Sequence, residues 1–229
     1  MYANNGDCKL YFETFGDPTN PTLLLVNGLG AQCTNYHEDW CQLFAAQGLQ
    51  VVRYDNRDIG LSSFFQNDVA YTLSDMAADG LAVLDALGVA SAHVMGLSMG
   101  GMIVQMMAIE HPERVLTMTS AMSTTGEDDY SKSSRRALEL LLEPAAPDRE
   151  GFIQQWVDGL HAWGTQEFAD ESRWRADAAR SFDRGGVLGG AARQFAAVMD
   201  NGSRADGLRE VRVPTLDDLF LALAMERTA

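Results

Sequence analysis

The sequence contains few cysteines, no long apolar run and no leader-like segment at its start. Its three cysteines, Cys8, Cys33 and Cys41, show no C-x-x-C spacing, so neither a disulfide framework nor a zinc site is indicated. No stretch approaches the roughly 18 apolar residues of a membrane span. Residues 1–8 lack the basic and apolar regions of a signal peptide. These absences predict a cytoplasmic protein with reduced thiols.

Positive charge is also scarce. The 229 residues include 17 Lys and Arg against 32 Asp and Glu, which gives a formal net charge of −15. The phosphate backbone of nucleic acids and anionic membrane surfaces would repel such a chain, so neither is expected as a partner. The hydrophobic fraction of 46% is ordinary for a globular protein and sufficient for one large domain or two small ones.

Against this background, residues 96–100 form a G-x-S-x-G motif between two apolar runs. The run 92–95 is typical of a buried parallel strand, and the run 102–109 is typical of a helix. A strand, a tight turn and a helix place the Ser98 hydroxyl on an exposed elbow, and Gly96 and Gly100 allow the close approach of strand and helix. The alternative is a glycine-rich turn of a Rossmann-like crossover. The context favours Ser98 as a nucleophile.

Strand-like and helix-like segments alternate through the first half of the chain. This alternation predicts an α/β fold with a mostly parallel sheet, flanking helices and a ligand site at the carboxyl ends of the strands. The predicted strands are 9–15, 22–26, 50–54, 92–95 and 114–119, and the predicted helices are 36–47, 73–87 and 99–110.

Residues 126–206 lack strand patterns and predict a helical cap over the site, with an ordinary helical subdomain as the alternative. We therefore expect a core at 1–125, a cap at 126–206, and a residual core strand with a terminal helix at 207–229. Within the cap, the apolar spacing predicts helices near 133–143, 149–163, 170–183 and 187–199.

Several of these segments together resemble the α/β-hydrolase superfamily. Residues 23–30 resemble its strand and oxyanion-hole loop, and residues 55–62 resemble its D-x-R-G-x-G-x-S turn, with Asp58 in place of the usual glycine. Residues 122–126 and 181–185 look most like the aclacinomycin-methylesterase-type serine esterases. The resemblance runs from about residue 8 to residue 216.

The resemblance implies a serine hydrolase that acts on a small-molecule carboxylic ester and uses no cofactor and no metal. Ser98 would form an acyl-enzyme, and the backbone N–H groups of Leu29 and Met99 would form the oxyanion hole. Each such donor stabilises the transition state by roughly 3 kcal/mol.

The acid and histidine of the family have no counterpart at the expected places. In the family the acid follows a strand that resembles residues 211–216, and the histidine follows one further strand. Here residues 217–225 predict a terminal helix, so about forty residues of core are missing by typical element lengths. Asp217 is a candidate acid, although its place favours a helix first turn. Asp128 is another, although its loop favours a solvated cluster.

Histidine is scarce as well, since the chain has four and none follows His161. His93 is expected about 16 Å from Ser98 along an extended strand, which favours a structural role. His111 is expected about 20 Å away along the helix axis, with the same consequence. His37, after the oxyanion loop, and His161, on a cap helix, are the remaining candidate bases.

Three hypotheses follow. The first is a serine esterase whose efficiency is limited by the missing histidine. The second is a non-catalytic ligand-binding pseudoenzyme, and the third is a truncated product on the same scaffold. The missing final strand also predicts an exposed sheet edge and self-association through it.

Overall fold

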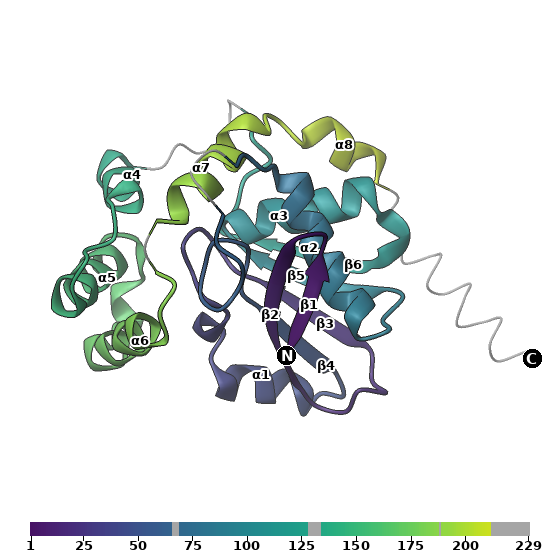
Figure 1. Ribbon diagram of the computed structural model, residues 1–229, viewed down its shortest axis with the longest axis horizontal. Helices are drawn as coiled ribbons and strands as arrows, with labels where there is room; N and C mark the ends of the chain where they lie inside the picture. Colours follow the sequence, from purple (N-terminus) through teal and green to yellow (C-terminus); the bar gives the residue numbers. More distant parts are fainter. Residues whose placement is uncertain (66–68, 128–133, 188, 212–229) are drawn as a thin grey trace, which may run out of the picture.

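A six-stranded sheet forms the centre of the molecule (Figure 1). The computed structural model describes residues 1–65, 69–127, 134–187 and 189–211. The strand order is β1-β2-β4-β3-β5-β6; β4, β3, β5 and β6 run parallel, and β1 and β2 are antiparallel to their neighbours. The predicted α/β class is confirmed. The strands are β1 (Tyr2–Asn5), β2 (Cys8–Phe15), β3 (Thr22–Val26), β4 (Gln50–Tyr54), β5 (Ala92–Leu97) and β6 (Val115–Ala121).

The inner strands β3 and β4 are buried at every residue, as expected of strands with both faces covered. Strand β1 was not predicted. It forms a hairpin with β2 in which Asn5 pairs with Cys8, so only Gly6 and Asp7 lie between the strands. Gly6 adopts φ +56°, and Gly-Asp is a typical two-residue hairpin turn that the sequence analysis overlooked.

Helices cover both faces of the sheet. Helices α2 (Leu73–Ala86) and α3 (Met99–Glu110) pack with β2–β5 in the larger apolar core. Helix α1 (Glu38–Ala45) packs on the opposite face against a smaller core that includes Leu25 and Val51. Helix α2 begins at the predicted Leu73, where Thr72 and Asp75 form a capping box, and Gly88 follows its end at φ +70°.

The helices after β6 form two groups in Figure 1. Helices α4–α6 lie beside the sheet, whereas α7 and α8 lie along α3, where the Gly207 backbone approaches the Ile109 side chain. Helix α8 crosses the predicted boundary at residue 206, and the division into core and cap stays a prediction. These helices are α4 (Arg135–Leu142), α5 (Arg149–Trp163), α6 (Glu171–Arg184), α7 (Ala191–Asp200) and α8 (Ala205–Glu210).

Within the described residues, β6 is the last strand of the sheet and most of it is exposed. Its apolar side chains Leu116 and Met118 are 43% and 37% exposed, in contrast to the buried residues of β3. Self-association through this edge stays a prediction. The predicted strand at 211–216 and helix at 217–225 lie outside the described residues, apart from Val211. No described helix combines the length and apolar character that crossing a membrane requires.

Candidate active site

Ser98 occupies a sharp elbow between a strand and a helix. Strand β5 ends at Leu97, α3 begins at Met99, and Ser98 between them adopts φ 55° and ψ −120°. A positive φ is uncommon for a residue with a side chain and costs on the order of 1–3 kcal/mol, so the surrounding structure must enforce it. The Ser98 N–H donates to the Ala121 carbonyl at 2.9 Å, which ties the elbow to β6. Ser98 itself is half-buried.

The two glycines of the motif lie where no side chain fits. A Cβ on Gly96 would lie 2.0 Å from the carbonyl oxygen of Gly100. A Cβ on Gly100 would lie 2.1 Å from the carbonyl oxygen of Val26 on β3. Both obstacles are backbone atoms of packed elements, so neither can move aside at low cost.

The loop after β3 faces Ser98. A Cβ on Gly28 would lie 3.2 Å from the Cβ of Ser98. The Asn27 side chain donates to the Gln32 carbonyl at 2.7 Å, and the Ala31 N–H donates to the Gly28 carbonyl at 3.3 Å, so the loop is closed on itself.

Two backbone N–H groups near the elbow, those of Leu29 and Met99, are candidate hydrogen-bond donors to a ligand. Across the part of the chain that the structure describes, no group accepts a hydrogen bond from the Leu29 N–H or the Met99 N–H. Leu29 lies on the loop that faces Ser98, and Met99 is the first residue of α3. A helix start favours negative charge, so an oxyanion at this place would be stabilised.

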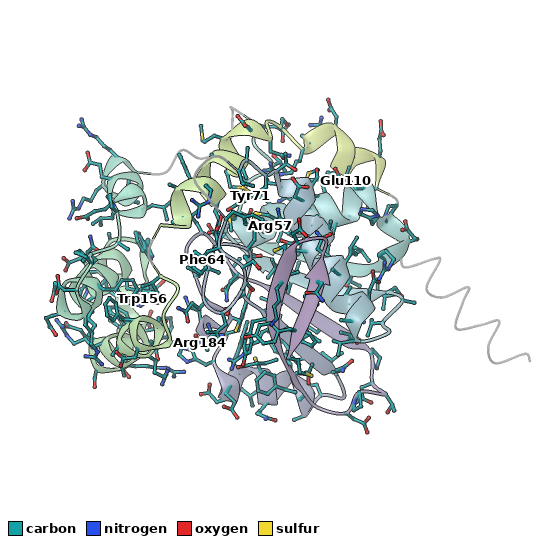
Figure 2. All side chains as sticks on the ribbon, in the orientation of Figure 1. Arg57, Phe64, Tyr71, Glu110, Trp156 and Arg184 are labelled. Atoms are coloured by element: carbon teal, nitrogen blue, oxygen red, sulfur yellow. The ribbon has the colours of Figure 1, made fainter. Side chains whose placement is uncertain are left out.

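Two buried aspartates organise the neighbouring loop after β4. Asp55 accepts the Cys33 N–H at 2.7 Å and the Leu61 N–H at 2.9 Å, and it also pairs with Arg184 of α6 at 2.7 Å. Arg184 lies at the boundary between α6 and the sheet domain (Figure 2). The loop after β4 is therefore tied both to the segment that follows β3 and to α6.

Asp58 stands where the family pattern has glycine, and it keeps the left-handed backbone with φ 68°. Its carboxylate accepts the Phe65 N–H at 2.8 Å and pairs with Arg193 of α7 at 2.8 Å. The departure from the family pattern thus has an ionic partner on a helix that follows the loop by more than a hundred residues. Sequence reasoning noted Asp58 but missed Arg193, because no short-range pattern links them.

The candidate bases contact residues other than Ser98. His37 precedes α1 and pairs through Nε2 with Asp177 of α6 at 3.1 Å. Burial lowers the pKa of the His37 imidazole, and the Asp177 carboxylate opposes that change. His161 lies on α5, where its ring meets the Trp174 ring edge-on at 5.1 Å.

The remaining histidines lie at the ends of core elements. His93 bonds Thr117 of β6 through Nδ1 at 2.8 Å, and His111 ends α3. None of the four histidines, all of them described, forms a hydrogen bond with Ser98. The candidate acids Asp128 and Asp217 lie outside the described residues.

A mostly parallel sheet with helices on both faces and a sharp strand-to-helix turn at Ser98 is the architecture of an α/β-hydrolase-type protein. Residues 21–181 match the alpha/beta hydrolase fold family, and the chain belongs to that family.

The curated relatives include esterases of known name. Rhodomycin D methylesterase DauP of Streptomyces sp. (strain C5) is 37% identical over 134 residues, which cover 58% of this chain and 45% of that protein. Rhodomycin D methylesterase DnrP of Streptomyces peucetius is 37% identical over 138 residues, covering 59% and 46%. The chain spans about half the length of these curated relatives.

Solved structures share the fold. A hydrolase from Pseudomonas aeruginosa PA01 superposes with a TM-score of 0.63 and 27% identity, covering 88% of this chain and 73% of that one. The enol-lactonase of Burkholderia xenovorans LB400 gives a TM-score of 0.67 at 20% identity, covering 93% and 78%. The second likeness concerns the fold alone.

Proposed function

We propose that the chain is a carboxylic ester hydrolase in which Ser98 is the nucleophile. The Ser98 oxygen attacks the carbonyl carbon of the ester, and the π electrons of the C=O bond move onto the carbonyl oxygen. The N–H groups of Leu29 and Met99 stabilise that oxyanion. When the oxyanion collapses, the C–O bond to the alcohol breaks and an acyl-Ser98 ester remains, which water then cleaves. The observation that carries this proposal is the φ of 55° at Ser98, held near the Leu29 and Met99 N–H groups, for which the described residues supply no acceptor.

The names of the relatives support an ester as substrate class, since two of them are methylesterases. The substrate is proposed to be a small ester, and no cofactor takes part.

Because no described histidine contacts Ser98, we expect the catalytic efficiency of ester hydrolysis to be low. We expect the Ser98 proton to pass to water and the acyl group to be attacked by water that no described histidine activates. Loss of the histidine of a serine triad costs on the order of 10⁶ in kcat and leaves about 10³ over the uncatalysed reaction. We therefore expect acylation by activated esters, followed by slow release of the acyl group.

The test is time-resolved hydrolysis of p-nitrophenyl acetate by the purified chain beside Ser98→Ala. The expected result is a burst of p-nitrophenol that approaches one equivalent and then slows, with an acetyl mass increment on Ser98. Ser98→Ala should lose the burst and the mass increment entirely. Ser123→Ala is the matched control, because it removes a serine hydroxyl near the start of α3 but outside the elbow.

The other outcomes separate the alternatives. Sustained turnover that depends on Ser98 would show that a substitute base exists, and His37→Gln and His161→Gln would then identify it. Identical traces for the parent chain and Ser98→Ala would refute the esterase proposal. Ligand binding by the folded chain would then favour the pseudoenzyme hypothesis, and failure to fold would favour the truncated product.

A further inference from the structure

A fully buried glutamine on helix α7 bonds the loop that carries Leu29. Gln194 is 0% exposed. Its Oε1 accepts the Gly30 N–H at 2.9 Å, and its Nε2 donates to the Arg57 carbonyl at 2.8 Å. A buried amide is tolerated when its polar atoms are bonded, and here each end of the amide bonds a different loop of the site.

The bond to Gly30 acts on the peptide next to the proposed oxyanion donor. Gly30 has φ +66°, and a Cβ there would lie 3.6 Å from the Cβ of Ala191, the first residue of α7. The Gly30 N–H belongs to the peptide that follows Leu29. Because this peptide is planar, fixing it restricts the ψ of Leu29, which together with φ sets the direction of the Leu29 N–H.

The other backbone N–H groups that form hydrogen bonds in this loop belong to residues further from Leu29 than Gly30. The Ala31 N–H is taken by the Gly28 carbonyl, and the Cys33 N–H is taken by Asp55. Those bonds fix the far side of the loop. Gln194 fixes the Gly30 N–H, whereas no group in the described part of the chain accepts from the Leu29 N–H.

Helix α7 is itself held to the core at the residue before Gln194. Arg193 forms two hydrogen bonds with the buried Asp58 carboxylate, at 2.8 and 2.9 Å. A shift of α7 away from the loop after β4 would therefore move Gln194 and release the Gly30 N–H.

We propose that Gln194 is a positioning residue that orients the Leu29 N–H and couples the placement of α7 to the oxyanion hole. Its consequence for acylation rests on the function proposed above. The effect of Gln194 on the loop is independent of that function, because the Gly30 hydrogen bond exists whether or not Ser98 reacts. The two proposals can therefore fail separately.

The experiment replaces Gln194 by methionine, which has a similar length and no amide. Gln154→Met is the matched control, because Gln154 lies exposed on α5 and its side chain bonds Asp158 and Arg175, far in the sequence from the Gly30 loop. Amide hydrogen exchange of the ¹⁵N-labelled chain reports the Gly30 N–H directly. We expect it to exchange at least about tenfold faster in Gln194→Met, while the amides of β3 are unchanged in both variants.

The kinetic readout is the acylation burst with p-nitrophenyl acetate at several ester concentrations. The acylation rate constant should fall on the order of 100-fold in Gln194→Met, because an oxyanion donor is displaced. The ester concentration at half-saturation should change little, since the ground state is bound before the oxyanion forms. Gln154→Met should match the parent chain in both quantities.

Gln194→Glu separates positioning from folding. Glutamate keeps an acceptor for the Gly30 N–H and loses the donor to the Arg57 carbonyl, so it should restore slow Gly30 exchange and most of the acylation rate. Unchanged Gly30 exchange in folded Gln194→Met would overturn the proposal, as would an equal loss of acylation in Gln194→Glu and Gln194→Met. A parent chain without a Ser98-dependent burst would refute the esterase proposal alone, and the exchange data would still decide the role of Gln194.

Discussion

Gly100→Ala is expected to destabilise the protein by about 3 kcal/mol or more and to remove most of the Ser98 burst. The added Cβ would lie 2.1 Å from the Val26 carbonyl oxygen and 2.7 Å from the Asn27 carbonyl oxygen. These two oxygens belong to the end of β3 and the start of the loop that follows it, so α3 must move away from the sheet. That movement carries Met99 and Ser98 with it, and one methyl group thereby affects both folding and acylation.

The sign of this effect is informative, because alanine normally stabilises a helix by about 1 kcal/mol relative to glycine. Gly80→Ala in α2 is the matched control: it is also buried and helical, and its Cβ would meet only side chains, at 3.3 Å or more. Urea unfolding should show a lower midpoint for Gly100→Ala and a parent-like or higher midpoint for Gly80→Ala. An unchanged midpoint and burst in Gly100→Ala would contradict the close approach of α3 to β3.

The parts of the site that are contiguous in sequence were predictable, and the parts that cross between elements were not. The elbow follows from five consecutive residues between two apolar runs, and the structure has β5 end at Leu97 and α3 begin at Met99. Gln194 and Gly30 lie 164 residues apart, and no periodicity links them. Asp58 was visible as a departure from the family pattern, but its partner Arg193 lies 135 residues away.

Among the helices and strands, some were likewise predictable from the sequence and others were not. The strands β3 and β4 and the helix α3 were predicted to the residue, because each is a mostly apolar segment with clear ends. Strand β1 was missed because two of its four residues, Asn4 and Asn5, are of a type that strands disfavour, and its pairing with β2 defines it better than its own sequence does. Helix α8 has six residues, too few for a periodic signal.

The ion pair of Arg57 with Asp79 is expected to make the largest contribution to the stability of the loop after β4. This loop carries Asp55, Asp58 and the Arg57 carbonyl that accepts from Gln194. Arg57 Nε lies 2.6 Å from Asp79 Oδ2, and Arg57 Nη2 lies 2.8 Å from Asp79 Oδ1. Both side chains are buried, and the Arg57 guanidinium lies 4.9 Å from the Tyr71 ring centroid (Figure 2). Among the described residues, Arg57→Met leaves the buried Asp79 carboxylate with the Asn5 amide as its side-chain partner, and we expect a loss of about 3–5 kcal/mol at pH 7.

The pH dependence identifies the cause of this loss. Burial raises the pKa of the Asp79 carboxyl, and Arg57 opposes that rise. Without Arg57 the folded-state pKa of Asp79 increases further above its unfolded value. A raised folded-state pKa means that the folded state holds the proton more tightly, so stability is gained as the pH falls and lost as it rises. The deficit of Arg57→Met relative to the parent chain should therefore shrink between pH 7 and pH 5.

The double variant Arg57→Met with Asp79→Leu supplies the control. It removes the stranded carboxylate as well, and replacement of both partners of a buried pair by apolar residues is often neutral in stability. It should therefore recover most of the loss and show little of the pH dependence. A pH-independent loss that is as large in the double variant would mean that packing at Arg57, rather than charge, stabilises the loop. Recovery of the fold without recovery of the Ser98 burst would show that Arg57 also places the carbonyl that Gln194 needs as an acceptor.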